Sequence, residues 1–147
     1  MSPYRVDARF SGRHPFELFT LFLTVITSLP TVLGITAPPL SINAAMPAAL
    51  VVGWSWVIFL GALLALAGIY WRYRPTGLLM EQVGMATTGA AALVYAGCIL
   101  LVASGGPLPA GIVGGFGIAC FWRWYQLQKV IDQAVAYDRM RKLEDNT

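Results

Sequence analysis

Residues 48–71, AALVVGWSWVIFLGALLALAGIYW, decide the fold because they form a long apolar run without one charged side chain. A helix needs about 20 apolar residues to cross the hydrocarbon core of a bilayer, and this run is long enough. Aromatic side chains lie near both of its ends, with Trp54 and Trp56 on one side and Tyr70 and Trp71 on the other. Aromatic belts of this kind anchor spanning helices at the two membrane interfaces. We therefore predict a membrane-spanning helix here.

Three further apolar runs follow the same rule, and the composition agrees with them. The chain is 57% hydrophobic and only 12% charged, which is far from the average of a soluble domain. The first run begins with Pro15 and Glu17, both typical of a helix start, and it exceeds the 7–15 apolar residues of a cleaved signal peptide. We expect an all-α membrane protein with four transmembrane helices, at about residues 16–35, 48–71, 78–103 and 108–124.

The basic residues predict how these spans are oriented. All ten lie in the N-terminal tail, between the second and third spans, or from the end of the fourth span onward, whereas segments 37–46 and 104–110 carry no charge. Lys and Arg concentrate on the cytoplasmic side of membrane proteins, so we expect both termini to be cytoplasmic. The net charge of +3 is then a membrane signal rather than a nucleic-acid signal. The three clusters are Arg5, Arg9 and Arg13; Arg72 and Arg74; and Arg123, Lys129, Arg139, Arg141 and Lys142.

The chain divides into a cytoplasmic tail (1–15), a four-helix transmembrane bundle (16–125) and a cytoplasmic helix with a short tail (126–147). In the last part, apolar residues recur at helical spacing among polar ones, which predicts an amphipathic helix that continues the fourth span. Arg123 is expected to extend its side chain to the membrane interface. The candidate residues for binding anionic lipid or a protein partner are Arg123, Lys129, Arg139, Arg141 and Lys142.

Two polar features inside the spans are candidate functional sites. Thr20, Thr24, Thr27 and Thr31 recur at spacings that place their hydroxyls on one helix face. They can bond back to their own carbonyls, pack against a neighbouring span, or line a wet path in an oligomer, and packing is the simplest of the three. Glu81, followed by Gln82, lies early in the third span, where we expect it to pair with Arg72 or Arg74 at the cytoplasmic interface rather than to couple transport.

Small residues at four-residue spacing predict close helix packing in three spans. The sequence leaves open whether each such face meets another span of the same chain or a second copy, and we therefore expect a homo-oligomer as one outcome. The candidate packing residues are Gly61 and Ala65 in the second span, Gly84 in the third, and Gly111, Gly115 and Ala119 in the fourth.

Catalysis, cofactor binding and metal binding find no support in the residue pattern. The single histidine, His14, lies in the N-terminal tail, and no set of Cys, Asp and His is spaced for a metal site or an activated nucleophile. The two cysteines, Cys98 and Cys120, are expected at different depths in the membrane, so we predict two unpaired thiols.

The strings HPFE (14–17), APPLS (37–41) and EQVG (81–84) resemble those of small four-span membrane proteins of bacteriophages that infect actinobacteria. Some of those proteins are described as holins or holin-like. The resemblance implies residence in the cytoplasmic membrane of a bacterial host, self-association, and permeabilisation or depolarisation of that membrane during lysis. It implies no catalytic residues.

Two other functions remain open from the sequence. The protein can instead be a membrane-anchored assembly subunit, without enzymatic activity, that docks a cytoplasmic partner through its C-terminal helix. A small transporter that uses Glu81 is a weaker alternative, because the spans place no acidic residue near the middle of the membrane.

Overall fold

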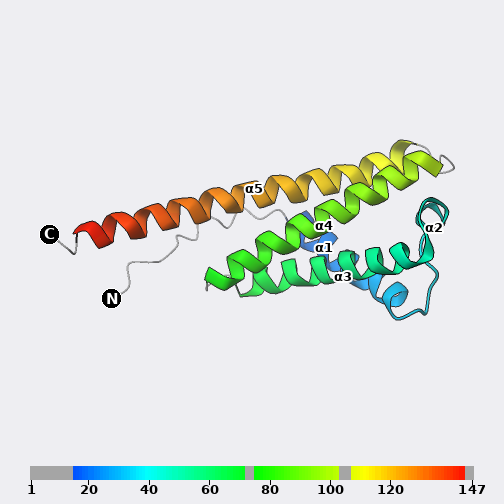
Figure 1. The fold of residues 1–147 in the computed structure, drawn as a ribbon, viewed down its shortest axis with the longest axis horizontal. Helices are drawn as coiled ribbons and strands as arrows, with labels where there is room; N and C mark the ends of the chain where they lie inside the picture. Colours follow the sequence, from blue (N-terminus) through cyan, green and yellow to red (C-terminus); the bar gives the residue numbers. More distant parts are fainter. Residues whose placement is uncertain (1–14, 72–74, 103–106, 145–147) are drawn as a thin grey trace.

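The computed structural model describes residues 15–71, 75–102 and 107–144, which form helices with no strand among them (Figure 1). The predicted all-α class is therefore confirmed for this part of the chain. The helices are α1 (Pro15–Val32), α2 (Leu40–Ala45), α3 (Ala48–Tyr70), α4 (Pro75–Val102) and α5 (Pro107–Glu144). The helices α1, α4 and α5 each begin at a proline, whose fixed φ and missing N–H suit the first helical position.

Two segments are long and apolar enough to cross a membrane, Ala48–Tyr70 and Thr76–Val102. They coincide with the predicted second and third spans, and they identify the chain as a candidate membrane protein. Phe16–Val32 is apolar as well but shorter than the predicted first span. The predicted fourth span and the predicted C-terminal helix form one continuous helix, α5, as the sequence pattern had indicated.

The end of α1 is set by Gly34, the residue at which the chain adopts a left-handed backbone conformation (φ 70°). The amide of Gly34 donates to the Thr31 carbonyl at 3.1 Å, and the amide of Ile35 donates to the Pro30 carbonyl at 2.9 Å. This pair of bonds is the Schellman motif, which satisfies carbonyls that the helix leaves open at its end. The first helix therefore ends three residues before the predicted boundary at residue 35.

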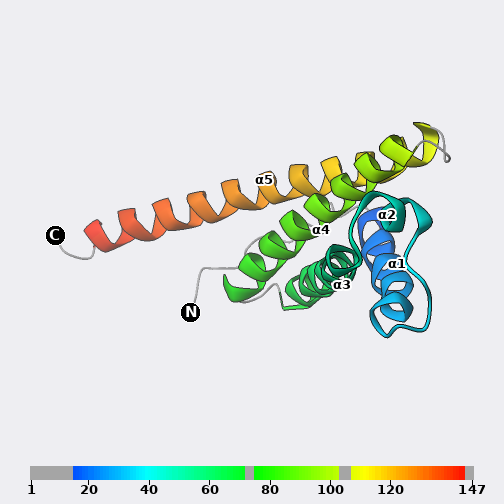
Figure 2. The same cartoon turned by 45° about the vertical axis from the view of Figure 1, so that its right-hand side comes forward.

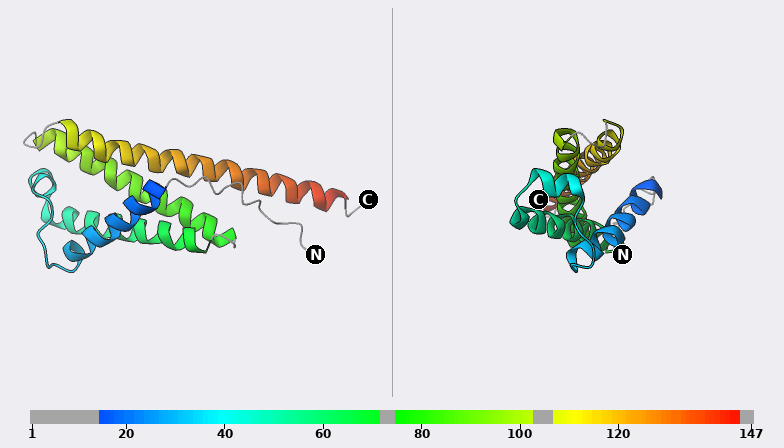
Figure 3. Two further views of the ribbon diagram at one scale, coloured as in Figure 1. Left: turned by 180° about the vertical axis from the view of Figure 1, so that it is seen from behind. Right: turned by 90° about the vertical axis from the view of Figure 1, so that its right-hand side faces the viewer.

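The helices pack as an open row rather than as a closed bundle. The helix α4 lies between α3 and α5, and the short α2 covers one end of α3 and α4 (Figure 2). Among the described helices, the backbone of α1 approaches α3 alone, and α1 crosses it obliquely (Figure 3). The C-terminal half of α5 extends well beyond the ends of α3 and α4 (Figure 1).

The pair α3–α4 owes its close contact to glycine. A Cβ atom added to Gly84 would overlap the backbone of Ala65 and lie 2.7 Å from the Gly61 carbonyl oxygen. One added to Gly68 would overlap the backbone of Glu81 and lie 2.7 Å from the Gly77 carbonyl oxygen. The two backbones are therefore in direct contact, which is how small residues stabilise helix pairs in a membrane.

Glycine also brings α4 and α5 close together, at the point where Gly89 of α4 meets Gly117 of α5. A Cβ atom at Gly117 would lie 3.0 Å from the Gly89 carbonyl oxygen, and one at Gly89 would lie 3.0 Å from the Gly117 carbonyl oxygen. Next to this crossing, Cys120 joins a buried cluster with Leu21 and Met85, to which α3 adds Ala62 and Ala65. The side chain of Leu21 thus connects α1 to the rest of the core.

The glycine contacts make a stability prediction with a matched control. We expect Gly84→Ala to lower the free energy of unfolding by about 1–3 kcal/mol, because the new methyl group must displace the backbone of α3. Gly97 lies in the same helix and has no atom within 4 Å of an added Cβ. Gly97→Ala should therefore be neutral or stabilising by about 0.5–1 kcal/mol. Unfolding in mixed detergent micelles measures both, and equal effects would contradict close α3–α4 contact.

Candidate functional site

An ion pair between α4 and α5 is the most polar feature buried in the described part of the chain. The side chain of Glu81 is only 1% exposed, and that of Arg123 is 14% exposed. Both Nη2 and Nε of Arg123 donate to the same Glu81 oxygen, Oε1, at 3.2 and 3.3 Å. A carboxylate this deeply buried is costly unless a cation and hydrogen bonds compensate it, and Arg123 supplies both.

Polar contacts continue from this pair toward the projecting part of α5. Gln82 donates from Nε2 to Oε1 of Gln128 at 2.8 Å, and Nη1 of Arg123 donates to Oε1 of Gln126 at 3.5 Å. The Gln82–Gln128 bond and the ion pair join α5 to the N-terminal end of α4, and with the Arg123–Gln126 bond inside α5 they form a polar layer.

The structure shows a partner of Glu81 that the sequence did not predict. We expected Glu81 to pair with Arg72 or Arg74, which lie outside the described residues, so that pairing stays a prediction. Arg123, which we expected to extend to the membrane interface, donates to Glu81. The sequence did contain a signal for this contact. Glu81 lies early in the third predicted span and Arg123 late in the fourth, and antiparallel neighbours place those positions at the same depth.

The threonine stripe of α1 lines one side of a groove, as its spacing predicts, and Ser28 joins it. Its hydroxyls bond back to their own helix: Thr20 donates to the Phe16 carbonyl at 2.7 Å and Thr24 to the Thr20 carbonyl at 2.8 Å. Thr27 and Ser28 donate in the same way, at 2.8 and 2.6 Å. The Thr31 hydroxyl instead pairs with that of Thr36 at 3.2 Å, so back-bonding is observed for three of the four threonines, and a role of the stripe in an oligomer stays a prediction.

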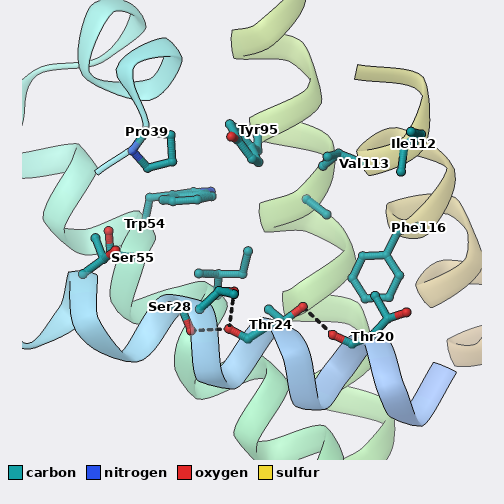
Figure 4. Close-up of a pocket in the computed structure, with 14 residues that line it drawn as sticks. Thr20, Thr24, Ser28, Pro39, Trp54, Ser55, Tyr95, Ile112, Val113 and Phe116 are labelled. Atoms are coloured by element: carbon teal, nitrogen blue, oxygen red, sulfur yellow. Dashed lines mark hydrogen bonds between the residues drawn. The ribbon is translucent and has the colours of Figure 1, made fainter. Parts of the chain in front are cut away.

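The groove has a volume of about 390 Å³ and lies between α1 on one side and α3, α4 and α5 on the other (Figure 4). Trp54 and Tyr95 stand on its wall with their ring centroids 5.5 Å apart. The indole Nε1 of Trp54 donates to the Ala91 carbonyl at 3.0 Å, which ties α3 to α4 beside the groove. Ile112 and Phe116 of α5 line the side opposite the hydroxyls.

The predicted packing residues divide into two groups. Gly61, Ala65 and Gly84 lie in the α3–α4 contact, so their predicted role in packing is confirmed within the chain. Gly111 and Gly115 have no described atom within 4 Å of an added Cβ, and Ala119 is exposed. Packing of the second group is not observed within the described chain, and its predicted role stays a prediction. The face of α5 that packs on α4 carries Gly114 and Gly117 instead.

The remaining candidates contribute little to a site. The Lys129 ammonium lies 4.5 Å from the centroid of the Tyr125 ring, and Lys129 itself is exposed. Arg139, Arg141 and Lys142 belong to α5, but their side chains lie outside the described ones. Cys98 and Cys120 are buried free thiols. No group of three metal-ligating side chains occurs among the described residues.

Comparison of the chain with protein-family models, with curated proteins and with solved structures finds no match. The resemblance to phage membrane proteins therefore stays a hypothesis, and function has to be argued from the geometry.

The ion pair yields a second prediction. We expect Arg123→Met to lower the free energy of unfolding by about 3 kcal/mol, because it removes a cation from a buried carboxylate. The exposed residue Lys129 is the control, and Lys129→Met should change stability by no more than about 0.5 kcal/mol. Adding Glu81→Gln to Arg123→Met should restore a large part of the loss. A double-mutant cycle with a coupling energy near zero would show that the pair does not hold α4 to α5.

Proposed function

We propose that the protein is a holin-like integral membrane protein that self-associates in a bacterial cytoplasmic membrane and permeabilises or depolarises it. In this proposal the chain spans the membrane four times with both termini in the cytoplasm. The candidate spans α3 and α4 form the centre, and α1 and the first half of α5 cross beside them.

The charge distribution supports this topology. The polar layer around Glu81 and Arg123 lies at the end of the row from which α5 projects, and Lys129 lies further along the projecting part of α5. At the opposite end, the segment from Leu33 to Pro47, which includes α2, carries no charged residue. Such asymmetry is typical of a membrane protein whose charged end stays in the cytoplasm.

The observation that supports self-association is the open small-residue face of α5, formed by Gly111, Gly115 and Ala119. The small residues of α3 and α4 pack against each other, whereas Gly111 and Gly115 have no described atom within 4 Å of an added Cβ and Ala119 is exposed. In lipid, helices associate by close van der Waals packing, for which a face without large side chains is suited. A second copy of the chain fits that requirement.

The test is expression in bacteria with a potential-sensitive dye as the readout. We expect the wild-type chain to depolarise the cells and Gly115→Leu to abolish depolarisation at equal membrane level, because leucine blocks close approach along α5. Gly53 of α3 also has no atom within 4 Å of an added Cβ, so Gly53→Leu is the matched control. It should leave depolarisation unchanged. Cells that keep their potential at high membrane levels of the wild-type chain would refute the holin-like function.

One observation favours a second function, that of a membrane-anchored assembly subunit. The helix α5 continues as a single helix to Glu144, and residues 129–144, beyond the Gln82–Gln128 bond, extend for roughly 24 Å at 1.5 Å per residue. A projecting helix of this length offers a docking surface to a cytoplasmic protein. Truncation after Tyr125 separates the two functions, because it should leave depolarisation intact if the spans act alone. Loss of activity with normal insertion would favour the assembly subunit.

A further inference from the structure

We infer that α5 pivots on α4 at the Gly89–Gly117 contact, and that the Glu81–Arg123 pair holds it in the position seen. The pair is then a conformational device, because it sets the direction in which the end of α5 projects. The motion needs one copy of the chain and no membrane, so it is independent of the function proposed above.

The pivot is the place where the backbones of α4 and α5 come into contact. A Cβ atom at Gly89 or at Gly117 would lie 3.0 Å from the carbonyl oxygen of the other residue. On one side of this crossing the helices stay close, since a Cβ atom at Gly114 would lie 3.5 Å from that of Ala96. On the other side, toward the N-terminal end of α4, they diverge (Figures 1 and 2). Two helices in contact at such a crossing can change their angle while the contact between the glycines remains.

Where the helices diverge, long side chains join them instead of backbones. Nε and Nη2 of Arg123 donate to Oε1 of Glu81 at 3.3 and 3.2 Å, and Gln82 donates to Gln128 at 2.8 Å. Glu81 precedes Gly89 by about two helical turns, so these bonds act well away from the pivot. They therefore oppose a change in the crossing angle more effectively than a contact at the crossing does.

The polar bonds can be released without loss of the pivot. Arg123 is partly exposed and the bond between the two glutamines is exposed, so solvent can replace both sets of bonds. Gly89 and Gly117 are buried, and their contact depends on neither charge nor solvent. Leu127 is buried as well and opposes the release, so α5 keeps its position while the ion pair is intact.

The projecting part of α5 follows the pivot as a rigid body. From Ile118 to Glu144 there is neither glycine nor proline, the residues at which helices usually bend. The stretch from Gly117 to Ala136 is about 28 Å long at 1.5 Å per residue, so a rotation of about 10° at the pivot moves Ala136 by about 5 Å. A small change at the ion pair is thus large enough to measure at the projecting end.

The test measures distances between pairs of spin labels by double electron–electron resonance, on the full chain in detergent micelles. The native thiols Cys98 and Cys120 are replaced by alanine, so that only introduced cysteines carry a label. Leu79→Cys in α4 and Ala136→Cys in α5, both at exposed positions, report on the end with the ion pair.

A second labelled protein provides the reference distance on the other side of the pivot. It carries Leu101→Cys in α4 and Ile118→Cys in α5, which are also exposed positions.

We expect Arg123→Met to lengthen the 79–136 distance by about 5 Å, the displacement of a rotation of about 10°. The physical reason is that Glu81 loses the cation supplied by α5, and its buried carboxylate then gains from contact with solvent. The 101–118 distance should not change. Adding Glu81→Gln to Arg123→Met removes the charge and should restore the 79–136 distance. Lys129→Met, which removes an exposed cation from the same helix, is the matched control and should alter neither distance.

Three results would overturn the pivot. An unchanged 79–136 distance in Arg123→Met would show that the ion pair does not hold the angle of α5. A change in both distances would show that α5 leaves α4 as a whole instead of turning about Gly117. A long 79–136 distance that persists in the double variant would show that the charge of Glu81 is not the cause. Since the measurement needs no membrane, none of these results decides whether the chain depolarises cells.

Discussion

Direct backbone contact between α3 and α4 is the constraint on which the rest of the structure depends. In lipid there is little hydrophobic driving force between helices, so association depends on how closely two backbones approach. Gly68 and Gly84 remove the side chains that would keep α3 and α4 apart, at two neighbouring points one helical turn from each other. With its backbone held against Gly68, Glu81 is buried, and its carboxylate requires compensation from a third helix. Arg123 of α5 provides it.

The ion pair in turn explains which face of α5 is open. Glu81 binds Arg123, Gly89 meets Gly117, and Ala96 lies near Gly114, so α4 and α5 run antiparallel in one register. That register turns Gly114 and Gly117 inward and leaves Gly111 and Gly115 without a neighbour. Two glycine faces on one helix thus acquire different environments. Among the described residues, α1 joins the core through the side chains of Leu21 and Val25, and its backbone approaches α3 alone, so a groove persists beside it.

Composition and spacing predicted the parts of this arrangement that depend on one helix at a time. The apolar runs at 48–71 and 78–103 became α3 and α4, and the threonine spacing placed four hydroxyls along one groove, because both follow from helix geometry and side-chain polarity. The contacts that depend on a neighbour were harder to predict. The fourth span is so rich in small residues that spacing alone does not choose between Gly111 and Gly114. The inward turn of Arg123 depends on the depth of Glu81 rather than on any local pattern.

Both candidate functions depend on α5, because this one uninterrupted helix contains both the open small-residue face and the projecting end. From Ile118 to Glu144 the sequence contains neither glycine nor proline, so no residue in that stretch is suited to form a hinge. A rotation of the projecting end is therefore transmitted along the whole helix, and the Glu81–Arg123 pair is one of the contacts through which α4 opposes it. Docking at the projecting end and association through Gly115 are consequently not independent events. A partner that turns α5 must either break that pair or move α4 together with it.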